Sequence, residues 1–384
     1  MKKIQRNVWV LGIVSLLNDI TSEAIVPILP IFLTNVLGVS PAIIGLIEGV
    51  GRATSRISRP VFGWLSDKFK KRRSFVIAGY SLSVIGRGLI GIATMWPMVL
   101  MGKFLDRLGK GARTPARDAL IAEFSDTDVR GTAFGIHRAL DTAGAIIAPV
   151  LTLAIMPFLP KLKAILHFPL HELNLLFVLM LIPGIATIPL ILFFVEDTKF
   201  EKKRVMGRIT PRFKRFIAVS GLFGLGYFPI AFAILKANEL GLNISDILIV
   251  YLLFNIAYTL TAFPAGKASD RFGKKQMLTL SYLLFGFVAL GFAFIHTTIE
   301  FILVLIMYGI FYAIFQVASR SFVSMLSEKE NLGKSYGILD FVFGIATMLG
   351  GFIIGLAWTS FGSGVAFSIS AVISIASAIA MLAV

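Results

Sequence analysis

The chain has 384 residues, of which 57% are hydrophobic and only 15% are charged. A soluble protein of this length carries more charge and shorter apolar runs, so the composition favours an integral membrane protein. The sequence contains no cysteine, which excludes disulfides, thiolate metal sites and cysteine nucleophiles. The formal net charge of +16 is compatible with nucleic-acid binding, but the placement of the basic residues argues against that partner.

Long apolar stretches follow one another along the chain with few polar residues between them. A membrane-spanning helix needs about 20 mostly apolar residues. Twelve stretches meet this length, at about 8–34, 42–66, 75–95, 97–122, 132–158, 172–195, 213–238, 246–269, 276–296, 299–324, 334–360 and 363–384. They are long and lack the period-two alternation of barrel strands. The sequence therefore predicts an all-α membrane protein with twelve transmembrane helices.

Basic residues gather in alternate connections between these stretches. They are found at 68–73, 199–215 and 267–275, whereas the intervening connections are nearly free of them except for Lys161 and Lys163. This alternation is the positive-inside pattern. It predicts a protein of the cytoplasmic membrane with both termini and the basic connections in the cytoplasm.

A ten-residue pattern occurs twice, at 63–72 and at 266–275, and the copies are 203 positions apart. Arg117 and Arg320 repeat at the same offset. Equivalent features in the same order predict two six-helix halves. We expect an N-terminal bundle over 1–195, a basic cytoplasmic linker over 196–215 and a C-terminal bundle over 216–384.

The duplicated turn resembles the signature of the major facilitator superfamily, Gly-x-Leu-(Ala/Ser)-Asp-(Arg/Lys)-x-Gly-(Arg/Lys)-(Arg/Lys). The first copy departs from it at Lys70 and the second at Ala268. The segment 102–109 resembles that family's second motif, with Lys103 at a position where arginine is usual. Residues Gly144 to Pro149 resemble its Gly-x-x-x-Gly-Pro antiporter motif, with Ala148 replacing glycine. The resemblance covers the whole chain and implies two pseudo-symmetric bundles, transport by alternating access and no enzymatic activity.

The two turns carry charges whose partners can be anticipated. Gly63 and Gly266 are expected to permit close helix approach. Asp67 and Asp270 lie at helix ends, where a carboxylate needs a basic partner, and Arg117 and Arg320 are the expected partners. The predicted cytoplasmic gate comprises Gly63, Asp67, Arg72, Arg117, Gly266, Asp270, Arg271 and Arg320. The alternative is that these charges only set topology and hold the structure together.

Ionisable residues at membrane depth are costly, so they face a cavity or a partner. The first half is rich in them and the second half is poor. Most are expected to pair with one another. A carboxylate whose solvation or partner changes during alternating access also changes its protonation. The candidates for proton coupling are Asp19, Glu23, Glu48 and Asp141.

Other buried polar and aromatic residues are candidates for lining a substrate cavity. In the family that the chain resembles, helices 1, 4, 7 and 10 line it, and prolines in helices 1 and 7 suggest bends there. The candidates are Arg52, Lys103, Asp106, Arg107, Arg138, Tyr227, Phe228, Lys236, Tyr312 and Gln316. The aromatic residues are equally consistent with packing. The excess of arginine and lysine favours an anionic substrate as one alternative.

The sequence predicts a secondary active transporter of a small solute, with proton antiport, and hence efflux, favoured by the motif at 144–149. Proton-coupled uptake of an anionic metabolite is the alternative, and a non-transporting sensor or scaffold with the same fold is another. No phosphate-binding glycine loop or metal-ligand cluster is present in the sequence, so we expect no cofactor and no metal. The expected partners are the solute, protons and the lipid bilayer, without nucleic acid, and the chain is expected to function as a monomer.

Overall fold

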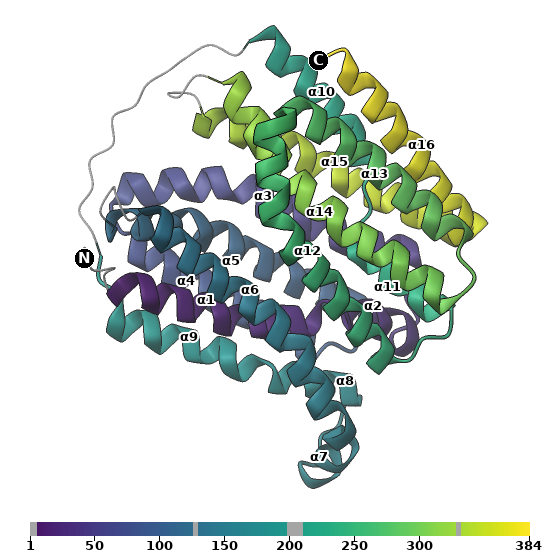
Figure 1. Cartoon of the computed structure of the whole chain (residues 1–384). Coiled ribbons are helices and arrows are strands. Elements are labelled where there is room, and N and C mark those ends of the chain that lie inside the picture. The colour runs from purple at the N-terminus through teal and green to yellow at the C-terminus, as the bar shows by residue number, and fades with distance from the viewer. Residues whose placement is uncertain (1–5, 126–129, 198–209, 328–331) are drawn as a thin grey trace. The chain divides into compact units, whose positions relative to one another are not determined.

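The computed structural model describes residues 6–125, 130–197, 210–327 and 332–384, and the regular structure of these residues is helical throughout (Figure 1). Ten helical segments are long and apolar enough to cross a membrane. The helices α3 (Pro41–Phe69, 29 residues) and α5 (Trp96–Glu123, 28 residues) are equally long but carry more charge. Each of the twelve predicted stretches therefore corresponds to helical structure.

The first half of the chain contains further α-helices before, between and after α3 and α5. They are α1 (Arg6–Ile25), α2 (Leu29–Ile31), α4 (Arg72–Gly91), α6 (Arg130–Ile155), α7 (Leu159–Ile165), α8 (Glu172–Leu179) and α9 (Leu181–Phe194). Proline explains one of the breaks, because Pro30 lies in the first turn of α2, where its missing N–H costs nothing.

The second half contains seven helices in the described residues. They are α10 (Pro211–Gly226), α11 (Ile230–Glu239), α12 (Ile244–Phe272), α13 (Lys274–Phe294), α14 (Thr298–Leu326), α15 (Leu332–Phe361) and α16 (Ser363–Leu382). The break between α10 and α11 falls at the predicted bend, with Pro229 at the N-cap of α11.

The chain divides into two compact units, and the division does not follow the chain simply. Unit 1 contains the residues up to Phe32 and those from Thr54 to the linker, whereas unit 2 contains Leu33–Ala53 and the second half. The expected linker falls largely on residues 198–209, which lie outside the described residues.

Residues 33–53 belong to unit 2 because the first part of α3 packs directly on α15. A methyl group built on Gly49 would lie 2.8 Å from Cα of Met348, and one on Gly355 would lie 2.5 Å from the carbonyl oxygen of Pro41. The N–H of Ala42 also donates to Thr359 Oγ1 at 3.2 Å. Such backbone contact requires glycine.

Unit 1 is built on two pairs of closely packed helices. Glycines at matching positions let α4 and α5 touch, because a methyl group on Gly86 would lie 2.5 Å from the carbonyl oxygen of Gly102. Gly79 and Gly109 form a second such contact. In the pair α1 and α6, a methyl group on Gly144 would lie 2.6 Å from the carbonyl oxygen of Leu16. These contacts place the polar side chains of α1, α4, α5 and α6 next to one another.

Unit 2 has an aromatic core instead. Phe223 lies at its centre, stacked on Tyr282 with a centroid distance of 3.9 Å, and Phe285 packs on Phe311 at 4.6 Å. Aromatic pairs at these distances add stability beyond the area that they bury. The phenylalanine-rich composition of the chain therefore has a packing role in this unit.

Candidate functional site

Two carboxyl groups meet in unit 1 where α1 packs on α6. Asp19 of α1 and Asp141 of α6 are hydrogen-bonded to each other through their side chains. A hydrogen bond between two carboxyl groups requires a proton, because an ionised carboxylate can only accept. Gly144, one turn beyond Asp141, makes the approach possible, since a methyl group there would lie 3.0 Å from Asp19 Cβ.

The surroundings of the two acids differ. Asp141 accepts hydrogen bonds from Ser15 Oγ at 2.6 Å and from Arg138 Nη1 at 3.1 Å, and Arg117 Nη1 donates to the same serine at 3.2 Å. These donors stabilise the ionised form of Asp141. Asp19 accepts a hydrogen bond from Asn18 Nδ2 at 3.0 Å and interacts with Glu23 and with Lys110, so it has an acid and a base as further neighbours. The two acids of the pair therefore have different polar neighbours.

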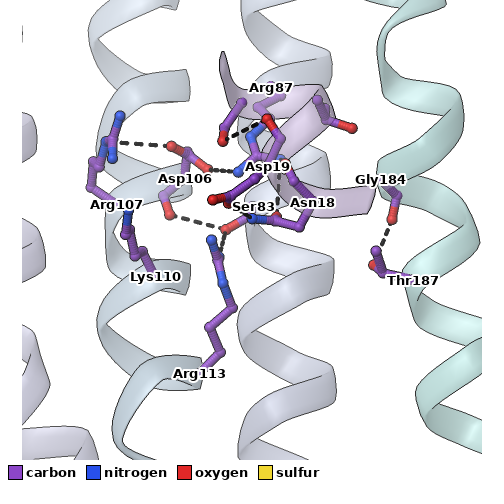
Figure 2. A network of polar contacts seen from close by, with 12 residues as sticks. Asn18, Asp19, Ser83, Arg87, Asp106, Arg107, Lys110, Arg113, Gly184 and Thr187 are labelled. Carbon is purple, nitrogen blue, oxygen red and sulfur yellow. Dashed lines mark hydrogen bonds and ion pairs between the residues drawn. The ribbon is translucent and has the colours of Figure 1, made fainter. Parts of the chain in front are cut away.

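A second polar cluster lies beside this pair and involves α1, α4 and α5 (Figure 2). Arg87 Nη2 forms an ion pair with Asp106 Oδ1 at 2.9 Å, and both side chains are buried. Arg87 Nη1 also donates to the carbonyl and side-chain oxygens of Asn18, at 3.2 and 3.1 Å. A buried charge needs such extensive pairing.

Other basic residues of α5 surround Asp106. Arg107 Nε lies 3.5 Å from Asp106 Oδ2, and Lys103 is buried at 5% exposure and interacts with the same carboxylate. Arg113 donates to Ser83 and lies over the ring of Tyr80, 4.7 Å from its centroid. The bases on α5 therefore outnumber the acid that they share.

The substrate-cavity candidates of unit 2 divide between two places. Lys236 Nζ binds Glu239 at 2.9 Å and Ser363 Oγ at 3.1 Å. Arg52 lies over the ring of Tyr227 at 5.2 Å, and Gln316 donates to the Tyr312 hydroxyl at 2.8 Å.

Phe228 is different from the other candidates, because it has no exposed surface and packs on Phe285 at 4.9 Å. The structure therefore gives it a packing role.

The ion pairs that we predicted at the duplicated turns, Asp67–Arg117 and Asp270–Arg320, are not the ones that the structure shows. Asp67 binds Arg72 at 2.9 Å, and Arg72 also pairs with Glu123. Arg117 instead binds Asp118 at 3.0 Å. The reason is local geometry. Arg72 follows Asp67 across a tight turn in which Lys70 has φ 52°, and this turn brings the guanidinium of Arg72 to the carboxylate.

The second turn also differs from the prediction. Arg320 lies 3.8 Å from Asp340 and over the ring of Tyr336, not on Asp270. Arg271 lies over the adjacent ring of Phe272. Gly63 does lie against Pro115, 3.4 Å from a built methyl group, but Gly266 has nothing within 4 Å, so close approach there was wrongly expected.

Sequence reasoning missed the small polar partners of the charged residues. Ser15, Asn18, Ser83 and Ser363 each bind one of the charged groups described above. The only signal was a serine or asparagine on a buried helix face, a common feature that does not identify a partner.

Known proteins resemble the chain along its whole length. The family model described as Major Facilitator Superfamily (MFS) matches residues 11–215 and again 216–384. A protein described as an uncharacterized MFS-type transporter of Methanocaldococcus jannaschii is 33% identical over 368 residues, covering 93% of this chain and 89% of its own.

Solved structures agree in fold. A mutant of the nucleoside transporter NupG has a TM-score of 0.82 at 15% identity and covers 98% of this chain and 99% of its own. A D-xylose-proton symporter has a TM-score of 0.73 at 14% identity, covering 98% and 96%. With two family matches that together span 11–384, the chain belongs to the Major Facilitator Superfamily and is a multi-pass membrane transporter, not an enzyme.

Proposed function

We propose that this transporter couples the movement of a small solute to protons, and that the hydrogen-bonded pair Asp19–Asp141 is the proton site. The observation that carries the proposal is the pair itself, because two carboxyl groups in a hydrogen bond hold one proton. Part of Asp19 remains exposed, so the proton can exchange with water.

The pair lies where alternating access can act on it. It bridges α1 and α6, and Asp141 is also held through Ser15 and Arg138. A change in the packing of α1 on α6 separates the two carboxyl groups and changes which charged groups surround Asp19. The proton is then released, because a carboxyl group that loses its carboxylate partner and gains access to water ionises more readily.

Proton antiport, with efflux from the cell, is the form that we favour. Its support is the motif at 144–149, since Gly144 is the residue that allows Asp19 and Asp141 to meet. The positive-inside pattern supports placement in the cytoplasmic membrane with both termini and the basic turns in the cytoplasm. Function as a monomer stays part of the proposal.

Proton-coupled uptake of an anionic solute is the second candidate. It is favoured by the bases of α5, because Lys103, Arg107 and Arg113 surround the single carboxylate of Asp106. Excess positive charge attracts anions.

The test is solute-dependent proton flux in proteoliposomes that contain the purified chain and a pH-sensitive dye. Ethidium, benzoate and xylose serve as a hydrophobic cation, an organic anion and a sugar, each with and without a pH gradient. We expect one class to move with protons, and Asp19→Asn to abolish the coupling. Glu172→Gln, which changes an acid on α8, is the matched control and should transport normally.

The direction of coupled flux separates the two candidates. An outward pH-driven flux of ethidium supports antiport, and inward movement of benzoate with protons supports uptake. The assignment of the proton site would be contradicted if full proton coupling remained in each of four variants, Asp19→Asn, Glu23→Gln, Glu48→Gln and Asp141→Asn.

A further inference from the structure

Unit 2 contains a second charged site, built around a single arginine among tyrosines. Arg52 of α3 lies over the face of Tyr227, with its guanidinium carbon 5.2 Å from the ring centroid. Tyr308 and Tyr312 of α14 lie within electrostatic range of the same guanidinium. Tyr227 and Tyr308 are buried at 2% and 1% exposure, whereas Arg52 and Tyr312 keep part of their surface accessible.

The arginine has unused hydrogen-bonding capacity. Its Nε atom is buried and has no hydrogen-bond partner among the described residues. The N–H groups of a guanidinium lie in its own plane, so a cation–π contact made by its face does not use them. A buried donor without a partner costs free energy, and a ligand that accepts from it recovers that cost.

Tyr312 provides a second donor at the same place. Its hydroxyl oxygen accepts a hydrogen bond from Gln316 Nε2 at 2.8 Å, so the hydroxyl proton is left to donate elsewhere. Its ring lies 5.2 Å from that of Tyr258 at an angle of 56°, and both side chains are partly accessible. Two tilted rings beside two donors form a surface for a flat group that carries acceptor atoms.

We infer that Arg52, Tyr312 and Tyr258 form the recognition site for an organic anion in which a carboxylate or phosphate is attached to a planar ring. The anionic group binds the in-plane donors of Arg52 and the hydroxyl of Tyr312, and the ring packs on Tyr258 and Tyr312. Charge-assisted hydrogen bonds to arginine suit both oxyanions. This inference rests on the transporter function proposed above for its biological meaning, and it names the substrate class.

Glu48 has a defined part in this site. It lies one helical turn before Arg52 and interacts with it electrostatically. In the empty site it balances the positive charge of the guanidinium, so an incoming anion competes with it. Removing the charge of Glu48 is therefore expected to strengthen anion binding, whereas removing that of Arg52 is expected to weaken it.

Equilibrium binding to the purified full-length chain in detergent tests the inference. Benzoate and phenyl phosphate are the anionic probes, and benzamide and benzylamine are the neutral and cationic analogues with the same ring. Isothermal titration should show binding of the anions only. Arg52→Gln should weaken benzoate binding roughly tenfold to a hundredfold, and Glu48→Gln should strengthen it.

Controls separate this site from folding and from proton coupling. Arg52→Lys keeps the charge without the planar fork and should bind benzoate at intermediate strength, with thermal melting confirming that each variant is folded. Asp19→Asn should bind benzoate normally even when its proton flux is lost, so the two proposals can fail separately. Equal affinity for benzoate and benzamide, or unchanged benzoate binding in folded Arg52→Gln, would overturn the inference.

Discussion

At the scale of single residues, the buried charges of unit 1 are of two kinds. Asp106 is a buried acid in an ion pair, since Arg87 lies 2.9 Å from it and both side chains are at most 6% exposed. Asp19 is hydrogen-bonded to another acid, Asp141, and stays partly accessible. The first arrangement holds helices together, whereas the second is the one that we propose as the proton site. Similar residue types on neighbouring helices therefore have different roles.

This distinction predicts that Asp106→Asn is strongly destabilising. The substitution leaves Arg87 buried without its counter-ion, and breaking one partner of a buried ion pair costs about 3–5 kcal/mol. Thermal unfolding of the purified protein in detergent should show a clearly lowered melting temperature. Asp118→Asn is the matched control, because the Asp118 side chain is 46% exposed and its pair with Arg117 is worth about 0–1 kcal/mol. Equal melting of the two variants would contradict a structural role for Asp106.

At the scale of helices, glycine contacts decide which polar groups meet. We predict that Gly144→Leu separates α1 from α6, because even its Cβ would lie 2.6 Å from the carbonyl oxygen of Leu16. The expected cost is about 1–3 kcal/mol, as in other overpacked interfaces. Because Asp19 and Asp141 then lose contact, proton flux in proteoliposomes should fall together with the melting temperature.

Gly135→Leu is the matched control for that experiment. Gly135 lies on the same helix and has nothing within 4 Å, so a leucine there meets open space. It should melt at or slightly above the wild-type temperature, because leucine favours the helix more than glycine does. If both leucine variants keep full coupling, the contact of α1 with α6 does not control the proton site.

The helices themselves were predictable, because about 20 apolar residues in a row leave few alternatives. The pairing of Asp67 with Arg72 was not predictable, because it depends on the tight turn at Lys70, which brings Arg72 to the carboxylate. The packing of residues 33–53 on α15 could not be predicted either, since a glycine such as Gly49 indicates a close contact but not the helix that it contacts. Of the candidate site, the sequence identified Asp19 and Asp141 as separate acids but not as a pair.

At the scale of the whole molecule, the two units are both helical bundles but carry different chemical groups. Unit 1 carries the carboxyl pair and the ion pairs of α4 and α5, whereas unit 2 has an aromatic core with Arg52 beside it. The two proposals above follow this asymmetry, because they place the proton site in unit 1 and the recognition of the solute in unit 2. The repeated turns at 63–72 and 266–275 are common to both units and therefore carry no information about the solute.

The orientation of the whole chain can be tested with introduced cysteines, because the natural sequence has none. Lys70 and Lys161 are exposed and are separated by α4, α5 and α6. An odd number of spans places them on opposite sides, and the positive-inside pattern assigns Lys70 to the cytoplasm. In intact cells, a membrane-impermeant maleimide should label Lys161→Cys, and should label Lys70→Cys only after the membrane is opened. The unmodified chain should not be labelled, and labelling of Lys70→Cys in intact cells would reverse the proposed topology and, with it, the proposed direction of efflux.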